Sequence, residues 1–303
     1  MCGVVAVLGR ENASKLVIEG LKKLEYRGYD SAGIASIFQG SLQTIKSEGK
    51  LIKLIDKLEN LSSDKGYFDT SVALGHTRWA THGNISVKNA HPLTSENKVA
   101  VVHNGIIENY LALKEQLIAE GYSFQSKTDT EVLPHLFSKY LKLGNNLLEA
   151  GRLVLNEIKG AFAFVAVSTD FPDQLFISRN SSPLAIGLGE DVNFVGSDAH
   201  SIDHLTKRII YLEDGDHGLV ETKNIQIFDK NTDKVDRKII NIQAEFGLIT
   251  KAGYSHFMEK EIFEQPSVIP QTISNYLKED SKIIIDIDKL GFEKKGSLVI
   301  CAA

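Results

Sequence analysis

The chain opens with the sequence MCGVVAV, residues 1–7, in which Cys2 and Gly3 lead directly into an apolar run. The apolar run predicts a buried β-strand, which would hold the start of the chain in a fixed place. If Met1 is removed, Cys2 carries a thiol and a free α-amine, and such an amine has a pKa of about 7.7–8.0. The stretch therefore predicts a nucleophile activated by its own amino terminus, as used in acyl transfer. The alternative is a cysteine that acts only as a small buried side chain.

Composition excludes several classes of protein. The 303 residues are 43% hydrophobic and 24% charged, which is typical of a soluble globular protein with one large domain plus a partial second, or two domains. The net charge of -5 and the lack of a basic block argue against a nucleic-acid binder. No apolar stretch is long enough to span a bilayer, and no secretory signal is present. Cys2 and Cys301 lie far apart and no Cys/His cluster has zinc spacing, so we expect a reducing cytoplasm and no metal site.

Short β-like runs dominate the first 240 residues, with amphipathic helical patterns between them. The predicted strands are 3–8, 33–38, 42–47, 71–76, 99–104, 162–167, 174–178, 184–188, 193–195, 209–212 and 217–221. The predicted helices are 13–24, 51–58, 109–120, 130–141 and 147–157. Asn109 is a candidate N-cap and Gly121 a candidate C-cap for the third helix. Many short strands with a few amphipathic helices indicate sheets packed on each other with helices outside.

The pattern changes after about Lys238. Residues 241–254 have no clear period, and the helical pattern of residues 255–265 is interrupted by Pro266 and Pro270. Two β-like runs follow, at 283–287 and 297–303, and the second ends without anything to cover it. We therefore expect a first domain over 1–240, a linker over 241–254 and the start of a second, truncated domain over 255–303.

The segment HTRWATHG, residues 76–83, follows a strand-like run and is interpreted as a loop. Arg78 can bind a carboxylate through two parallel hydrogen bonds, and Thr81 and His82 can add donors. Loops on a rigid scaffold often carry binding sites. The alternative is a surface loop with a half-buried Trp79.

The segment VVHNGIIEN, residues 101–109, is predicted as a strand that leads through Asn104-Gly105 into a helix. The side-chain amide of Asn104 and the backbone N–H of Gly105 can both point at one developing oxyanion. Glycine permits the close approach that this geometry needs. The alternative is an ordinary Asn-Gly turn.

Two further polar segments hold candidate residues. In KTDTE, residues 127–131, either Thr128 or Asp129 can cap the following helix, and Asp129 can instead pair with a substrate ammonium group. Arg27 lies in a glycine-punctuated stretch between a helix and a strand. It can bind an anion, brace the amino terminus or form a structural salt bridge.

The candidate residues together describe one substrate. Arg78 suits an α-carboxylate and Asp129 an α-ammonium group. Asn104 and Gly105 suit an oxyanion, and Cys2 suits attack on a carbonyl. A free amino acid with a side-chain amide meets all four demands, and glutamine is the leading candidate. The chemistry would be thioester formation, release of ammonia and hydrolysis to glutamate.

These motifs resemble those of the N-terminal nucleophile glutamine amidotransferases and, within them, the glutaminase domain of the glucosamine-6-phosphate synthases. The resemblance covers essentially the whole chain and runs through residues 1–3, 26–33, 76–83, 89–92, 102–109, 128–132 and 256–266. It implies an α+β fold, a four-layer α/β/β/α sandwich of the N-terminal nucleophile hydrolase type. The residues alone had indicated packed sheets with outer helices but not this layer order.

The resemblance also implies a role for each candidate residue. Cys2 would be the nucleophile with its own α-amine as base, and Asn104 and Gly105 would form the oxyanion hole. The remaining side chains would surround the substrate: Arg78, Thr81, His82 and Asp129 on the backbone groups of glutamine, Trp79 as the gate of an ammonia channel, and Arg27 near the terminus.

For the full-length enzyme, the resemblance implies two sugar-isomerase domains that convert fructose 6-phosphate to glucosamine 6-phosphate without a metal or organic cofactor, and it leaves a homodimer open. Residues 1–240 would be the glutaminase domain and 255–303 the truncated start of the isomerase half, with Cys301 packed in its first strand. We expect a cytoplasmic protein that hydrolyses L-glutamine, has glutaminase activity only, and binds neither nucleic acid nor membrane.

Three other classes of protein remain as alternatives. A phosphoribosyl-pyrophosphate amidotransferase has the same type of glutaminase domain, but the loop at 79–82 matches the synthases better and no phosphoribosyl-binding acidic loop follows residue 238. A self-processing peptidase would usually need a propeptide before its nucleophile. A binding module that senses glutamine or a sugar would keep all its activity after substitution of Cys2.

Overall fold

The computed structural model describes residues 2–65, 69–79, 84–242, 254, 258–259, 262–266 and 269. The chain divides into two compact units, Met1–Glu245 and Phe246–Ala303. The strands predicted at 283–287 and 297–303, and Cys301 with them, lie outside the described residues. The three-part division into glutaminase, linker and isomerase start stays a prediction.

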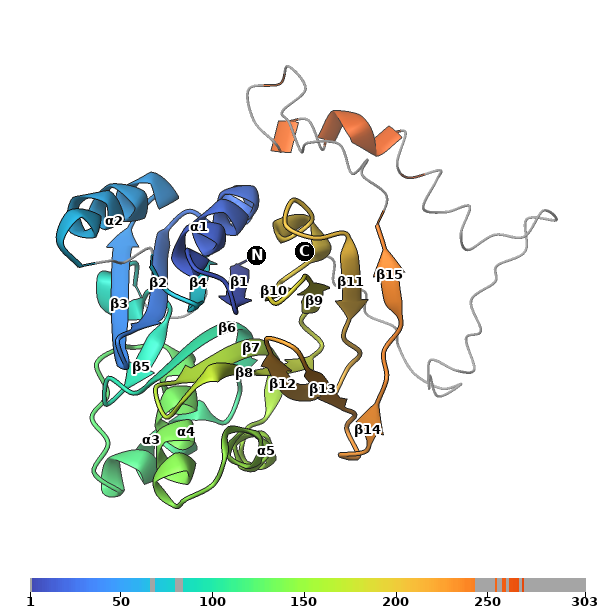
Figure 1. The fold of residues 1–303 in the computed structure, drawn as a ribbon. Coiled ribbons are helices and arrows are strands. Elements are labelled where there is room, and N and C mark those ends of the chain that lie inside the picture. The colour runs from blue at the N-terminus through green and yellow to red at the C-terminus, as the bar shows by residue number, and fades with distance from the viewer. Residues whose placement is uncertain are drawn as a thin grey trace, which may run out of the picture. The chain divides into compact units, whose positions relative to one another are not determined.

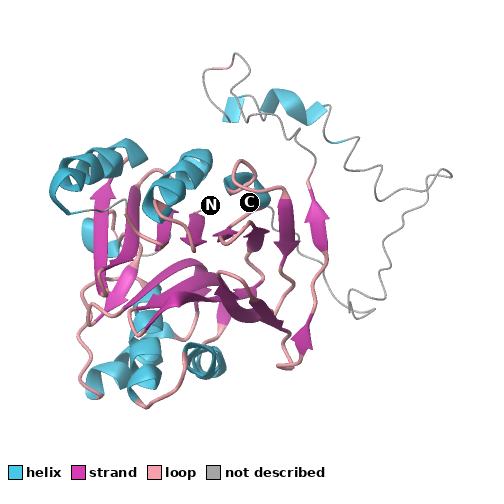
Figure 2. Cartoon of the chain, viewed as in Figure 1, coloured by secondary structure: helices cyan, strands magenta, loops and turns pink. Residues whose placement is uncertain are grey.

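Two antiparallel sheets form the centre of the first unit (Figure 1; Figure 2). The eight-stranded sheet has the order β15-β11-β9-β10-β1-β4-β2-β3, with β1 (Gly3–Leu8) inside it between β10 and β4. Its other strands are β2 (Ser31–Phe38), β3 (Ser41–Glu48), β4 (Val72–Arg78), β9 (Ala185–Leu188), β10 (Asn193–Gly196), β11 (Arg208–Tyr211) and β15 (Ile239–Asn241). The start of the chain therefore lies between paired strands, as its apolar sequence predicts.

The second sheet has seven strands in the order β14-β13-β12-β8-β7-β6-β5. They are β5 (Leu93–Ser95), β6 (Val99–Ile107), β7 (Gly160–Ser168), β8 (Phe171–Asn180), β12 (His217–Glu221), β13 (Ile225–Phe228) and β14 (Lys234–Val235). β6, β7 and β8 form its long central meander, because each strand pairs with the next along most of its length.

Helices cover the outer face of each sheet (Figure 2). α1 (Ala13–Leu24) and α2 (Leu51–Lys65) pack on the eight-stranded sheet, and α3 (Tyr110–Ala119), α4 (Val132–Lys142) and α5 (Leu147–Glu157) pack on the other. The predicted α+β, four-layer α/β/β/α sandwich is confirmed. None of the helices in the described part of the chain has both the length and the apolar character needed to cross a membrane.

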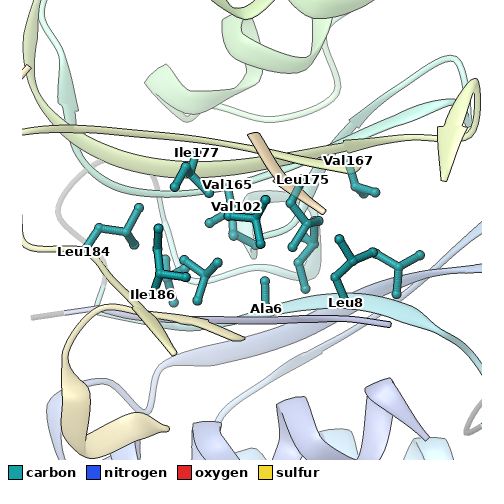
Figure 3. Close-up of a cluster of buried hydrophobic side chains, with 14 of the residues drawn as sticks. Ala6, Leu8, Val102, Val165, Val167, Leu175, Ile177, Leu184 and Ile186 are labelled. Atoms are coloured by element: carbon teal, nitrogen blue, oxygen red, sulfur yellow. The ribbon is translucent and has the colours of Figure 1, made fainter. Parts of the chain in front are cut away.

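A hydrophobic core fills the space between the two sheets (Figure 3). Alternate residues of β1, including Ala6 and Leu8, face this core, whereas Val5 and Val7 face the helices on the other side. Both faces of β1 are therefore buried, which explains its unbroken apolar sequence. Burial of each such side chain contributes about 1.5–3 kcal/mol, so the strand is held firmly.

Gly121 and Asn109 were predicted to cap the two ends of α3, and the structure confirms the first but not the second. Gly121 follows the last turn at φ 94° and its N–H returns to the carbonyl of Ile118, as expected of a residue that ends a helix. Asn109 occupies the N-cap position, but its side chain makes no capping bond. It bonds instead to Glu157 O and Lys159 N, and so ties α3 to the end of α5.

Candidate active site

A cavity of about 380 Å³ lies beside the first residue of β1 and the carboxyl-terminal ends of β4 and β6. Six of the nine predicted site residues line it: Cys2, Arg78, Trp79, Asn104, Gly105 and Asp129. Thr81 and His82 lie outside the described residues. Arg27 ends a short 3-10 turn, Glu25–Arg27, and its side chain is also outside the description. The cavity thus joins predicted residues from four segments that lie far apart in the sequence.

Cys2 lies at the amino-terminal end of β1, and pairing of Gly3 with Thr77 fixes it beside β4. The Trp79 N–H donates to Cys2 Sγ at 3.1 Å, and Sγ lies 3.4 Å from the Trp79 carbonyl oxygen. Burial raises the pKa of the Cys2 thiol, and the Trp79 backbone hydrogen bond only partly offsets this. The thiol therefore stays protonated at neutral pH and needs a base to become a nucleophile.

The prediction that residues 76–83 form a loop is wrong for its first three residues. β4 continues to Arg78, because Thr77 pairs with Gly3 on one side and Arg78 pairs with Ser31 on the other. Arg78 is 4% exposed, which places a permanent positive charge in the cavity wall. A guanidinium fixed on a strand is oriented more firmly than one on a loop.

Residues 101–109 do lead from a strand, β6, into a helix, α3, as predicted, but the strand continues through Asn104-Gly105 to Ile107, so the turn alternative is wrong. Both residues lie within β6, where they pair with Ala163 and Phe162 of β7. Gly105 has φ 123°, and a Cβ atom there would lie 2.0 Å from the Ala161 carbonyl oxygen. Glycine is therefore required for this strand to approach β7 while it lines the cavity.

Two backbone carbonyls determine how the Asn104 amide is oriented. The Cys2 oxygen can only accept, so the Asn104 atom 3.1 Å from it is Nδ2. His76 Nε2 lies 3.1 Å from the His103 carbonyl and 3.0 Å from Asn104 Oδ1, so Nε2 must carry the proton and donate. His76 thus holds the amide oxygen and leaves the amide NH₂ on the side of Cys2.

His76 belongs to a buried group of three histidines. Its ring stacks on His91 at 4.3 Å between centroids, and His91 Nδ1 accepts from the backbone N–H of His103. Burial lowers the pKa of His76 to about 3 and that of His103 to about 4. Both rings are therefore neutral at physiological pH, and they position neighbouring groups without adding charge.

Asp129 lines the same cavity as Arg78. Its Oδ2 accepts from the backbone N–H of Ile107 at 2.7 Å, and the residue is 5% exposed. The helix-capping alternative is wrong, because neither Thr128 nor Asp129 makes a side-chain cap bond to the turn Asp129–Glu131. The hydrogen bond to Ile107 instead ties the carboxylate to the end of β6.

Trp79 lies at the edge of the cavity and is 46% exposed. Its ring meets Tyr29 edge-to-face, with centroids 5.4 Å apart. A large indole held at its edge by a single aromatic contact can change position without disturbing the core.

Sequence reasoning missed Ser197, which follows β10 and lines the same cavity. Its Oγ accepts from Val4 N at 2.7 Å and from Asn104 Nδ2 at 3.1 Å, so it joins β1 to the Asn104 amide. His76 was part of a quoted motif but was given no role. The available signal was a lone serine directly after a short predicted strand, which by itself is too common to single out.

In the described part of the chain, no group of three or more His, Cys, Asp or Glu side chains is arranged to hold a metal ion. The His76 and His103 nitrogens that meet polar partners bond to Asn104 and Thr130.

Comparison with known proteins gives consistent results. A family model described as "Glutamine amidotransferase domain" matches residues 76–204. A glutamine–fructose-6-phosphate aminotransferase (isomerizing) of Fusobacterium nucleatum is 44% identical over 290 residues, 94% of this chain and 46% of that protein. One from Rhizobium meliloti is 44% identical over 306 residues, 100% of this chain and 49% of that protein. The chain spans about half the length of the curated relatives it matches.

Among solved structures, a glutamine phosphoribosylpyrophosphate amidotransferase from B. subtilis is similar with a TM-score of 0.62. It is 26% identical and is matched over 77% of this chain and 50% of that chain. The relatives from F. nucleatum and R. meliloti are thus more similar in sequence than this structural neighbour.

Proposed function

Since the chain carries a glutamine amidotransferase domain of the N-terminal nucleophile class, we propose that it hydrolyses the side-chain amide of glutamine, with Cys2 as the nucleophile. The observation that carries the proposal is the meeting of Cys2, Arg78 and Asp129 in one cavity. A thiol, a fixed cation and a fixed carboxylate match the three reactive or charged parts of a free amino acid amide.

Cys2 attacks the amide carbon of glutamine after removal of Met1. The α-amine of Cys2 takes the thiol proton and passes it to the departing nitrogen, which leaves as ammonia. A water molecule then hydrolyses the thioester, which releases glutamate and restores the thiol. Because burial raises the pKa of the thiol, this neighbouring base is needed at neutral pH.

Substrate recognition follows from the charges. Arg78 binds the α-carboxylate and Asp129 the α-ammonium group, and Thr81 and His82 add donors to the α-carboxylate. The Asn104 amide and the Gly105 N–H stabilise the oxyanion. For Asn104, the glutamine oxygen would replace Cys2 O or Ser197 Oγ, the present acceptors of its NH₂ group.

The names of the relatives support a wider reaction. We propose that the ammonia is used to convert fructose 6-phosphate to glucosamine 6-phosphate in the other half of a full-length enzyme, and that Trp79 gates its passage with Arg27 near the terminus. The higher identity to these relatives favours this reaction over phosphoribosyl transfer. The full enzyme would be cytoplasmic, without a nucleic-acid or membrane partner, and a homodimer is compatible with this proposal.

The first experiment compares glutamate release from glutamine with aspartate release from asparagine, using purified protein whose intact mass shows that Met1 is absent. We expect turnover of glutamine only. Cys2→Ala should reduce the rate by about 10³-fold or more, because the covalent route is lost, with an unchanged melting temperature.

Cys2→Ser is the matched control for volume, since it keeps the shape but not the reactivity of the thiol. Wild-type turnover by Cys2→Ala, or equal turnover of asparagine, would contradict the proposed function. If a sample of confirmed mass hydrolyses neither amide, the glutaminase proposal for this chain is wrong.

A further inference from the structure

A second cavity, of about 360 Å³, lies between the last turns of α5 and the neighbouring ends of β8 and β12. Arg152, Arg179 and Lys230 line it, together with uncharged polar side chains such as Asn156 and Asn180. None of the described residues that line it is acidic. A chain with a net charge of -5 has therefore gathered three cations around one hollow.

Arg152 is held in a defined orientation. Its guanidinium carbon lies 4.2 Å from the centroid of the Phe228 ring, and its Nε donates to His217 Nε2 at 3.3 Å. His217 Nδ1 faces the Gly215 carbonyl, which can only accept, so the proton is on Nδ1 and Nε2 is free to accept from Arg152. Burial lowers the pKa of His217, which keeps the ring in this neutral form.

The guanidinium of Arg152 makes no ion pair with any carboxylate of the described residues. Its partners are a ring face and a neutral imidazole, which orient the group but do not neutralise it. A partly buried cation without a counter-ion is costly, and an anion bound between its terminal nitrogens would remove that cost. This arrangement differs from Arg237 nearby, which pairs with both Asp216 and Glu213.

Arg179 and Lys230 are the other two cations in the lining of this cavity. Arg179 lies 3.3 Å from Asp214, a carboxylate that is 61% exposed and outside the lining. Lys230 is exposed, and its backbone and Cβ lie close to Gly215. A Cβ atom added to Gly215 would lie only 2.6 Å from the Cβ of Lys230. The carbonyl end of α5 adds only partial negative charge, which is small beside the full positive charges of Arg152 and Lys230.

We propose that this cavity binds the phosphate group of a small molecule. Three cations favour a doubly charged anion, and the flat fork of Arg152 suits two oxygens of a tetrahedral group. The volume is within the range of pockets that hold small metabolites. The site is separate from the Cys2 cavity in its lining residues, and it does not depend on the glutaminase proposal.

The test uses the full chain, labelled with ¹⁵N, and follows the arginine Nε–H signals during titration with inorganic phosphate at constant ionic strength. The signal that disappears in Arg152→Gln identifies Arg152. We expect this signal to shift to saturation, with acetate binding about fivefold more weakly because it carries one charge. Titration with glycerol 3-phosphate distinguishes the two sources: tighter binding than inorganic phosphate indicates an organic phosphate, and equal binding indicates the free ion.

Arg152→Gln should weaken phosphate binding by about fivefold or more, measured by calorimetry, because the bidentate contact is lost. Lys230→Gln should weaken it by about threefold, and it is the second variant because its exposed side chain is not needed for folding. Arg10→Gln is the matched control, with the same change of charge at an exposed arginine after β1. Absence of saturable binding, or equal affinity in Arg152→Gln, Lys230→Gln and Arg10→Gln, would overturn the proposal.

Discussion

His76 controls a neighbour rather than contacting the proposed nucleophile. Its Nε2 proton holds Asn104 Oδ1 and thereby keeps the amide NH₂ toward Cys2. Without that donor, the amide can rotate and present its oxygen to the developing oxyanion, which repels it. Loss of a direct oxyanion donor costs about 10²–10³ in kcat, and loss of its support should cost less.

We expect His76→Leu to lower kcat for glutamine hydrolysis by about tenfold, with KM changed by less than about threefold, because in the proposed mechanism Asn104 acts on the transition state rather than on binding. His76→Gln should recover most of the rate, since its amide nitrogen can donate from a similar position. Steady-state kinetics with melting temperatures for both variants provide the measurement. Equal losses in the two variants would indicate that His76 acts through packing alone.

The candidate residues could be predicted from sequence where short motifs carry recognisable chemistry. Cys2, Arg78, Asn104 and Asp129 were assigned in this way, and the structure brings all four to one cavity. The orientation of Asn104 could not be predicted, because it depends on His76 and Ser197, which lie 28 and 93 positions away along the chain. Contacts between strands so distant in sequence have no local signal.

α5 is the helix whose start is most clearly specified by its sequence. Asn146 accepts from the Glu149 N–H, and the Glu149 side chain accepts from the Asn146 N–H, which forms a capping box. The helix carries Arg152, so its stability also affects the second cavity.

Asn146→Ala should destabilise the protein by about 1 kcal/mol, because the backbone N–H of Glu149 loses its acceptor. Asn60→Ala is the matched control, since Asn60 is an exposed residue inside α2, where alanine has the higher helix propensity. Urea unfolding of both variants measures the difference. A stability of Asn146→Ala equal to that of Asn60→Ala would contradict the role of the cap.

Among the elements, those with a regular apolar pattern were predicted best. β1, α1 and α5 have the predicted bounds, because each has a continuous or periodic apolar face. β5, β13, β14 and β15 were missed, since each has only two to four residues. β4 and β6 extend beyond their predicted ends because pairing with neighbouring strands outweighs the polar character of Arg78 and the low strand propensity of Gly105.

At the scale of the whole molecule, the buried carboxylate of Glu131 makes the stability of the fold depend on pH. Glu131 Oε1 accepts from Gln125 N at 2.8 Å, and Oε2 accepts from Ser126 N and Oγ, each at 2.7 Å. Burial acts to raise the pKa of Glu131, but these hydrogen bonds and the nearby His135, whose Nε2 lies 3.8 Å from Oε1, outweigh it and lower the pKa to about 2. Lys46, on β3 of the eight-stranded sheet, adds a nearby positive charge.

A pKa that is lower in the folded than in the unfolded state means that ionised Glu131 stabilises the fold above about pH 4.5 and that this contribution is lost as the pH falls toward about 2. Glu131→Gln should therefore be less stable than wild type at pH 7, and the difference should shrink by pH 3. Urea midpoints at pH 7, 5, 4 and 3 test this, with the exposed Glu115→Gln as control. A difference that is constant with pH would contradict it.

For the molecule as a whole, the layer order could not be derived from apolar periodicity. β1 places Ala6 and Leu8 against the second sheet and Val5 and Val7 against the helices, yet all four positions carry similar side chains. A strand buried on both faces has no polar side to indicate which layer it meets. The α/β/β/α order came from the resemblance, and the two sheets confirm it.

The position of β1 in the middle of its sheet matters to anyone who produces this protein in the laboratory. Cys2 leads straight into that strand and lines the cavity, with β10 and β4 on either side. A purification tag fused in front of Cys2 would occupy the approach to the thiol and would acylate the very amine proposed as the base. Expression vectors for this protein should therefore place affinity tags elsewhere, or use a protease whose cut leaves Cys2 as the first residue.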